Sequence, residues 1–445
     1  MWAREREERE REMALDRRDS VSSAPWRGNA AGSLFFGAAE ASRKLAEYVN
    51  SVIEALSTQN GRTLASLLAI SSANSFCELV ASALELAKEP IKILKQVDKH
   101  APLGDMLSNH TKCMHSYQQR RYVEAFNALE KSANMFLQEF RSWESAWAME
   151  ALHTIVYELR TLAQMADREM VANGKIPDKL KGAGSFLMKV FGALAGKGPK
   201  RVGALYVTCQ LFKVYFKLGT VHLCRSVIRS IETARVFDFE EFPARDRVTY
   251  MYYTGRLEVF NDNFMGAEKK LMYALRHCHS SKRTNVRMIL KYLVPVKLSL
   301  GTLPKEWLLQ KYNLREYLNV VRALRRGDIK LLRHALHANE DGFLRSGVYL
   351  VLEKLEQQVY RRLMKKIHII QKLKDPARAH QIKMEVIVKA LSWLDINMDV
   401  EEVECIMAIL IHKNYIKGYF SHKSKVVVLS KQDPFPKLNG RANIL

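Results

Sequence analysis

The C-terminal end of the chain carries the most informative pattern of apolar and polar positions. Apolar residues recur at helical spacing over 386–394 and again over 400–411, with a short polar turn between the two runs. Gly418 then interrupts the helical pattern, and two short runs rich in aromatic and β-branched residues, 416–420 and 426–429, flank a polar link. The order helix, turn, helix, hairpin predicts a winged helix, which is a shape that binds nucleic acid or docks a protein partner rather than one that suggests a catalytic pocket.

A degenerate helical repeat is predicted upstream of the winged helix. From Ala38 onward the apolar residues keep helical spacing, and several segments begin with a small polar turn and an aromatic, followed by Ala and Leu at steps of three and four residues, as in 121–129 and 263–275. In a tetratricopeptide-like helix pair the small Ala lets two helices approach and the aromatic fills the gap beside it. The chain is therefore predicted to be all-α, a tetratricopeptide-like superhelix of irregular repeats that ends in a winged helix with a small β-hairpin.

Breaks in the pattern divide the chain into four predicted parts. Residues 4–12 alternate Arg and Glu without an apolar face, so a disordered tail and linker are expected at the N-terminus. Gly- and Lys-rich residues interrupt the helices at 174–203, where a short amphipathic helix between two loops is expected, and a second break follows at 301–304. The predicted parts are the tail and linker 1–37, the N-terminal helical repeats 38–203, the repeats that adjoin the winged helix 204–348, and the winged helix with its C-terminal tail 349–445.

Length and composition favour an ordered protein with more than one core. The chain has 445 residues, of which 48% are hydrophobic, so it can bury two or three cores. Its apolar runs fall short of the roughly 18 to 20 residues of a membrane helix, and the first residues lack the apolar core of a secretory signal, so neither is expected. The six cysteines lie in apolar helical patterns without a C-x-x-C pair and are expected to be reduced core thiols.

The net charge of +23 is unevenly distributed along the chain. Up to Asn173 there are 21 Lys and Arg against 23 Asp and Glu, whereas from Gly174 onward there are 49 against 24. Such asymmetry favours a polyanionic partner, which can be nucleic acid, an anionic membrane face or an acidic protein. The alternative is a solvated, Lys-rich helical surface.

A basic platform is predicted just before and within the winged helix. The run 361–383 carries eight basic residues interleaved with apolar ones, and four further lysines lie on the second helix end and the hairpin. The predicted phosphate contacts are Arg361, Arg362, Lys365, Lys366, Lys372, Lys374, Arg378, Lys383, Lys413, Lys417, Lys423 and Lys425. Because the second helix begins with acidic residues (Glu401, Glu402), which suit a helix N-terminus, these contacts are expected to give affinity without sequence readout. Apolar edges near Tyr415, Tyr419 and Phe420 are predicted to dock a partner's winged helix.

The sequence gives little support to the hypothesis that the protein is an enzyme or binds a metal ion. Residues 196–200 lack the spacing and the preceding strand of a phosphate loop. The run His277-Cys278-His279 cannot place all three side chains on one ion, because adjacent helical residues point about 100° apart. An enzyme that used this region would need a pocket with convergent titratable groups, and the sequence offers no such cluster. No catalytic residue, metal or other cofactor, and no small-molecule substrate or membrane partner, is therefore expected.

Several segments resemble the PCI-domain family, which is named for the proteasome lid, the signalosome and a translation initiation factor. The closer resemblance is to the PCI domain-containing protein 2 family; it covers roughly residues 100–440 and is dense from about 204. The segments that carry it are 210–217 (QLFKVYFK), 222–224, 247–256 (RVTYMYYTGR), 277–279, 287–297 and 431–436.

This resemblance implies a non-enzymatic subunit of a nuclear-pore-associated complex that couples transcription to mRNA export. Such a subunit would pair its winged helix with that of a large Sac-type scaffold, hold a small acidic subunit shared with the proteasome lid, and contribute to a joint basic surface for RNA or DNA. It would lie in the nucleus, with the cytoplasm as a second location. The alternative within the same fold is a purely architectural subunit of a proteasome-lid or signalosome-like complex, without nucleic-acid binding.

Overall fold

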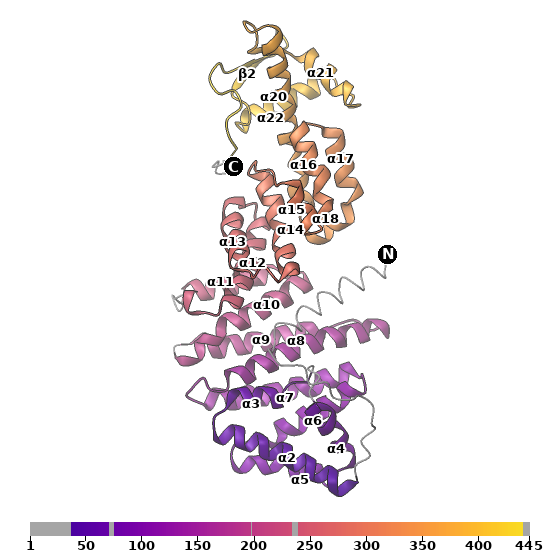
Figure 1. The fold of residues 1–445 in the computed structure, drawn as a ribbon, viewed down its shortest axis with the longest axis vertical. Coiled ribbons are helices and arrows are strands. Elements are labelled where there is room, and N and C mark those ends of the chain that lie inside the picture. Colours follow the sequence, from indigo (N-terminus) through magenta and orange to yellow (C-terminus); the bar gives the residue numbers. More distant parts are fainter. Residues whose placement is uncertain (1–36, 71–74, 197, 234–238, 439–445) are drawn as a thin grey trace. The chain divides into compact units, whose positions relative to one another are not determined.

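The computed structural model describes residues 37–70, 75–196, 198–233 and 239–438, and the chain divides into two compact units at residue 250. The predicted charged tail, apart from residue 37, lies outside these residues. Each unit is described by itself (Figure 1). Of the helices in the described ranges, none is long and apolar enough to cross a bilayer.

The N-terminal unit is a stack of helices, in which each of the longer helices packs against its neighbours along the chain. The helices are α2 (Ala38–Ser57), α3 (Gly61–Leu67), α4 (Ser75–Leu86), α5 (Pro90–Leu94), α6 (Gly104–Gln118), α7 (Tyr122–Ser142), α8 (Met149–Ala172), α9 (Lys179–Leu194), α10 (Ala204–Leu218) and α11 (His222–Thr233), with 3-10 turns η1 (Lys95–Lys99), η2 (Pro199–Gly203) and η3 (Phe239–Glu241). Helix α9 confirms the amphipathic helix expected within 174–203, although it is longer than predicted.

The predicted helix-pair design is confirmed in α7. Ala125, Phe126 and Leu129 are buried, as the three- and four-residue spacing requires, and their helix packs against α6, α8 and α9. The Ser132 hydroxyl donates to the backbone carbonyl of Met106 at 3.1 Å, so α6 and α7 approach closely enough for a side chain to bond the neighbouring backbone. Small residues on the shared face therefore permit the close packing of the repeat.

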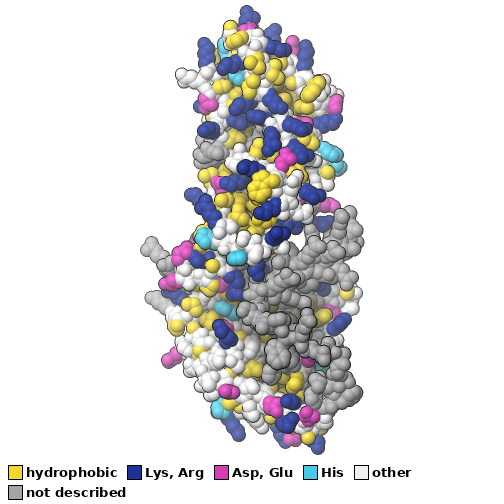
Figure 2. All heavy atoms as spheres, viewed as in Figure 1, with side chains coloured by type: hydrophobic (Ala, Val, Ile, Leu, Met, Phe, Trp, Pro, Cys, Tyr) yellow, Lys and Arg dark blue, Asp and Glu magenta, His cyan; other side chains and the backbone are white. Residues whose placement is uncertain are grey.

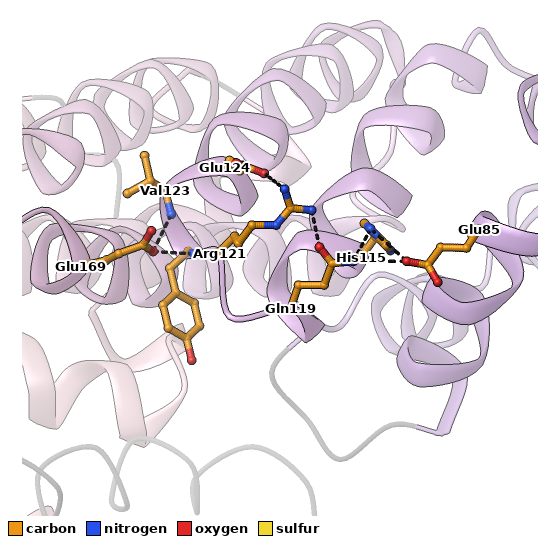
Figure 3. A network of polar contacts seen from close by, with 8 residues as sticks. Glu85, His115, Gln119, Arg121, Val123, Glu124 and Glu169 are labelled. Carbon is orange, nitrogen blue, oxygen red and sulfur yellow. Dashed lines mark hydrogen bonds and ion pairs between the residues drawn. The ribbon is translucent and has the colours of Figure 1, made fainter. Parts of the chain in front are cut away.

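The start of α7 is fixed by a carboxylate from α8 (Figure 3). Glu169 Oε2 accepts hydrogen bonds from the backbone N–H groups of Tyr122 at 2.6 Å and Val123 at 3.1 Å. The first N–H groups of a helix have no partner within the helix and form its positive end, so a carboxylate is favourable there. A surface pair between Arg121 and Glu124 at 2.8 Å lies beside this contact.

The C-terminal unit continues the helical repeat and then forms the winged helix. Its repeat consists of α12 (Ala244–Phe260, which begins in the first unit), α13 (Phe264–His277), α14 (Arg283–Ser299), α15 (Glu306–Lys311), η4 (Arg315–Tyr317), α16 (Leu318–Arg326), α17 (Ile329–Ala338), α18 (Glu340–Ser346) and α19 (Tyr349–Glu353). The expected break at 301–304 separates α14 from α15. The conspicuous 247–256 motif has a structural role, because Arg256 lies among aromatic rings, 4.4 Å from the centroid of Tyr292.

Helix α20 (Glu356–Lys374) connects the repeat to the winged helix, which consists of β1 (Gln381–Lys383), α21 (Met384–Trp393), α22 (Val400–His412), β2 (Gly418–Ser421) and β3 (Val426–Leu429). The predicted helices and hairpin are confirmed. The sheet has one strand more than the predicted hairpin, since β1 pairs antiparallel with β3 and the sheet order is β1-β3-β2. The predicted capping role of the acidic start of α22 is confirmed by Asp399 and Glu402, which form a capping box.

Candidate nucleic-acid and partner interface

Helix α20 is anchored by one apolar face and presents its basic residues on the others. Val359, Leu363 and Ile367 are buried, whereas the last two turns of the helix are exposed. Six predicted contacts have no side-chain hydrogen bond or ion pair within the part of the chain that the structure describes: Lys365, Lys366, Lys372, Lys374, Arg378 and Lys383. All but the half-buried Lys365 are exposed. These six residues, called here the α20 row, follow one another along α20, the loop after it and β1; Lys365 and Lys372 share one face of the helix, whereas Lys374 lies on the opposite side.

Arg361 is placed differently from the prediction. Its Nε donates to the backbone carbonyl of Tyr415 at 3.0 Å, and its Nη2 donates to the carbonyls of Phe435 at 3.2 Å and Pro436 at 2.6 Å. The guanidinium thus fastens the C-terminal tail to the winged helix, because carbonyls that leave regular structure need donors. The expectation that Arg361 offers its donors to phosphate does not agree with this geometry.

Arg362, the next residue, connects α20 to the helical repeat. Its Nε donates to the backbone carbonyl of Arg325 at 3.1 Å. The contact is close because Gly327, which ends α16 with a φ of 71°, brings the two backbones together: a Cβ at this position would lie 2.7 Å from the backbone nitrogen of Leu363. Arg362 remains partly exposed and is continuous with the α20 row.

Three of the four predicted lysines of the second helix end and hairpin are engaged inside the chain. Lys413 Nζ donates to Gln357 Oε1 at 3.0 Å, and Lys417 Nζ lies 3.8 Å from the carboxylate of Asp433. Lys425 Nζ lies 2.7 Å from Glu404 Oε1, and this hydrogen bond holds the pKa of Glu404 below its ordinary value. Lys423 is exposed and has no side-chain partner among the residues that the structure describes. The predicted platform therefore divides into an open α20 row and a mostly engaged hairpin.

The predicted docking residues lie on or beside the open edge of the small sheet. Tyr419 is 63% exposed on β2, which is an edge strand, while Tyr415 and Phe420 are half-buried. An edge strand offers unpaired backbone groups to a second chain. Other exposed apolar side chains of α20 to α22 were missed by the sequence reasoning: Ile369, Ile370, Leu373, Val386, Trp393 and Ile409. Apolar residues interleaved in the basic run were the available signal for those on α20.

The histidines and cysteines that the sequence brought into question form no metal-binding group among the described residues. No group of three or more His, Cys, Asp or Glu side chains in them is placed so that it could hold a metal ion. His277 bonds the backbone of its own helix, and Cys278, expected to be a buried thiol, is half-buried at the helix end. Cys405, expected in the core, is exposed on α22, because the buried positions Val403 and Met407 fix the opposite face of that helix.

A cavity of about 230 Å³ lies near residues 196–200, the loop whose sequence was weighed above against a phosphate loop. It is lined by Glu144, Lys200 and Arg201 together with small residues. Lys200 Nζ donates to the backbone carbonyl of Phe140 at 2.8 Å, so its ammonium caps the end of α7. Since no strand precedes this loop in the described chain, the arrangement differs from that of a nucleotide site.

Comparison with known proteins gives the family of the chain. Residues 333–431 match the PCI domain. The chain is 64% identical to Enhanced ethylene response protein 5 of Arabidopsis thaliana over 402 residues, which cover 90% of this chain and 97% of that protein. It is 36% identical to PCI domain-containing protein 2 of Xenopus laevis over 403 residues, 88% of this chain and 98% of the relative, and 30% identical to Protein CSN12 homolog of Mycosarcoma maydis over 442 residues, 88% and 97% respectively. A helical repeat that ends in a winged helix, a matching PCI domain and similarity over nearly the full length of these relatives show that the chain belongs to the PCI domain-containing protein 2 family.

Proposed function

We propose that this chain is a non-enzymatic scaffold subunit of a nuclear-pore-associated complex that couples transcription to mRNA export, and that it binds RNA or DNA by phosphate contacts. PCI-domain proteins are generally non-catalytic subunits that assemble with other PCI subunits. The observation that supports nucleic-acid binding is the α20 row, in which six cations without side-chain hydrogen bonds or ion pairs within the described chain follow one another over about the last three turns of α20, the loop after it and β1. Figure 2 shows Lys and Arg side chains spread across the visible face of the C-terminal unit.

Binding through the α20 row would be sequence-independent. Lysine and arginine contacts to phosphates release counterions and give affinity that falls steeply with salt, but they carry no base information. The first turn of α22, where a recognition helix would present Arg, Asn or Gln to the bases, contains Glu401 and Glu402. The proposed ligand is therefore a nucleic-acid backbone of any sequence.

The proposed partners are a Sac-type scaffold, which would pair with the winged helix, and a small acidic subunit. Support for the first comes from the open edge of β2 with the exposed Tyr419, and from exposed Leu373 and Trp393 on α20 and α21. Large exposed apolar side chains on a small unit are typical of interaction surfaces. Support for an acidic subunit comes from the positive charge of the C-terminal part of the chain.

A charge-reversal experiment tests nucleic-acid binding. Lys366, Lys372, Lys374 and Lys383 are changed together to Glu in the full-length chain, and the affinity for a 20-nucleotide RNA is measured by fluorescence anisotropy from low to physiological salt. The expected result is weaker binding and a salt slope that falls by about 0.7 for each phosphate that the protein no longer neutralises. The matched control reverses four exposed lysines of the N-terminal unit that have no side-chain ion pair in the described chain: Lys88, Lys112, Lys131 and Lys175. Equal losses of affinity in both variants would show that net charge alone, rather than the α20 row, determines binding.

The second candidate function is a purely architectural subunit of a proteasome-lid or signalosome-like complex. It is favoured by the internal use of Arg361 and Lys425, which removes two predicted contacts from the surface available to phosphate. In the same experiment it predicts that the unaltered chain binds no RNA even at low salt, so that both charge-reversed variants are indistinguishable from it.

A further inference from the structure

An exposed tryptophan lies in the helical repeat, outside the winged helix. Trp307 is on α15, the short helix that follows the break at 301–304, and its side chain is 56% exposed. Leu309 of the same helix is fully buried, so the helix has an anchor in the core besides the indole. A large planar ring left in solvent is unusual, because burying it would be favourable.

The surroundings of Trp307 are positively charged. Lys311 Nζ lies 5.8 Å from the centroid of the indole ring, and Lys305 is exposed two residues before it. Glu306, the acid that precedes Trp307 in the sequence, is neutralised by two arginines of α16: Arg322 Nη2 lies 2.9 Å and Arg325 Nη1 3.3 Å from its carboxylate oxygens. The hydrogen bond from Arg322 holds the pKa of Glu306 below its ordinary value, so this acid stays ionised and paired.

Arg325 and its neighbour Arg326 lie between Trp307 and the α20 row. Arg325, which pairs with Glu306, accepts through its backbone carbonyl the hydrogen bond from Arg362. Arg326 is exposed at the end of α16, and its side chain has no hydrogen bond or ion pair among the described residues. Lys366 follows Arg362 by four residues, which is about one turn or roughly 6 Å along α20. Positive side chains thus lead from the α20 row, through the contact of α20 with α16, to α15.

We propose that Trp307 is a stacking platform for one base of a single-stranded nucleic acid whose backbone follows Lys366, Arg362 and Arg326 toward α15. This inference rests on the proposed nucleic-acid binding and specifies its ligand, since duplex bases are already stacked and cannot reach an indole ring. Every base has a flat face, so stacking on an exposed aromatic beside a basic track tolerates any sequence. An acidic peptide would also match this positive charge, but a series of cations that leads along α20 and α16 to an exposed ring is the arrangement that single-stranded nucleic acid uses, with phosphates on the cations and a base on the ring.

Removal of the ring, without change of charge, tests the proposal. Trp307→Ala and Trp307→Phe are compared in the full-length chain by anisotropy with a labelled 20-nucleotide oligouridine and with a 20-base-pair duplex. Trp307→Ala is expected to raise the Kd for oligouridine about 5- to 100-fold and to leave the duplex Kd within about twofold, while Trp307→Phe keeps most of the affinity. The salt slope for oligouridine should not change, because no cation is removed. The control is Phe260→Ala, which removes another exposed ring of the same unit (41% exposed), and thermal melting checks that each variant is folded.

Each other outcome overturns a defined part of the argument. If the unaltered chain binds neither ligand at low salt, the proposed nucleic-acid function fails and this inference fails with it. If charge reversal of the α20 row weakens oligouridine binding but Trp307→Ala does not, only the stacking proposal is wrong. Equal losses of affinity for oligouridine and duplex also overturn it. If Trp307→Ala abolishes binding of an acidic 20-residue peptide that contains one tryptophan and leaves oligouridine binding intact, the surface docks a peptide instead.

Discussion

Glu404 determines how much positive charge the hairpin of the winged helix presents. Its carboxylate lies 2.7 Å from Lys425 Nζ and 2.8 Å from His422 Nδ1, so it holds two basic side chains against α22. The side chain of Glu404 is only 13% exposed, which limits the competition of water for these contacts. Since the folded state lowers its pKa, the carboxylate stays ionised at neutral pH, and its contribution to stability is lost only as the pH falls through the lowered pKa.

We predict that Glu404→Gln strengthens nucleic-acid binding. The substitution removes the charge that holds Lys425 while keeping the size of the side chain, so the ammonium becomes available to phosphate. One added contact corresponds to a salt slope steeper by about 0.7 and to about fivefold tighter binding at 0.1 M salt. Anisotropy with the 20-nucleotide RNA measures both. The matched change Glu401→Gln removes an exposed acid of the same helix that has no ion pair within the described chain. An equal gain in the two variants would mean that long-range repulsion, rather than release of Lys425, is responsible.

The sequence could not predict whether each basic side chain points into solvent or toward the rest of the protein. Arg361 and Lys366 belong to one basic run, yet Arg361 turns inward to three backbone carbonyls whereas Lys366 lies in solvent. The distinction depends on where the C-terminal tail passes, and residues 434–436 are some 70 positions away in the sequence. Helical periodicity gives the face of α20 on which a residue lies, but not what covers that face.

At the level of elements, the junction of α7 and α8 shows how one side chain stabilises the start of a helix. We predict that Glu169→Ala destabilises the N-terminal unit by about 1–3 kcal/mol, because two backbone N–H groups are left without their acceptor. Glu169→Gln should cost less, since the amide oxygen still accepts but the charge at the helix N-terminus is removed. Hydrogen exchange at Tyr122 and Val123, together with thermal unfolding, measures the effect.

The control for this substitution is Glu124→Ala on the same helix. Glu124 forms an exposed pair with Arg121, and pairs of this kind contribute at most about 1 kcal/mol. If the two substitutions destabilised the unit equally, the carboxylate of Glu169 would have no special role at the start of α7.

The elements of the winged helix were predictable in proportion to their length and local pattern. Helices α21 and α22 and the hairpin strands β2 and β3 have enough periodic apolar residues to be recognised. Strand β1 has three residues, of which only Ile382 is buried, and its partner β3 lies more than 40 residues later. A strand this short forms because it can pair with β3, which is already part of the hairpin. Its own three residues therefore carry almost no sequence pattern that would predict it.

At the level of the whole molecule, the charged and the exposed apolar side chains suit different ligands. The α20 row contains cations that stay in solvent, which suits phosphate, whereas Leu373 and Trp393 expose large apolar side chains, 82% and 84% respectively, that suit a protein surface. Trp is enriched among the residues that dominate protein interfaces. Leu373 lies between Lys372 and Lys374 of the α20 row, so whether the apolar and the basic side chains act separately is a question that substitution can answer.

We predict that Leu373→Ser with Trp393→Ala removes a PCI-domain partner and leaves RNA binding intact. The removal of two exposed anchors should weaken partner binding at least tenfold, since each such anchor contributes about 1 kcal/mol or more. Tagged full-length protein is recovered from nuclear extract and its co-purifying PCI and Sac-type subunits are quantified by mass spectrometry, while the purified chain is titrated with the 20-nucleotide RNA.

The matched control, Ile176→Ser, removes an apolar side chain that is 85% exposed in the N-terminal unit. Unchanged partner recovery in the double variant would exclude these residues from the interface, and loss of both activities would show that the two surfaces are one. Because the double variant removes no charge, loss of the partner with an unaltered RNA salt slope would separate the scaffold role from the nucleic-acid role in one chain.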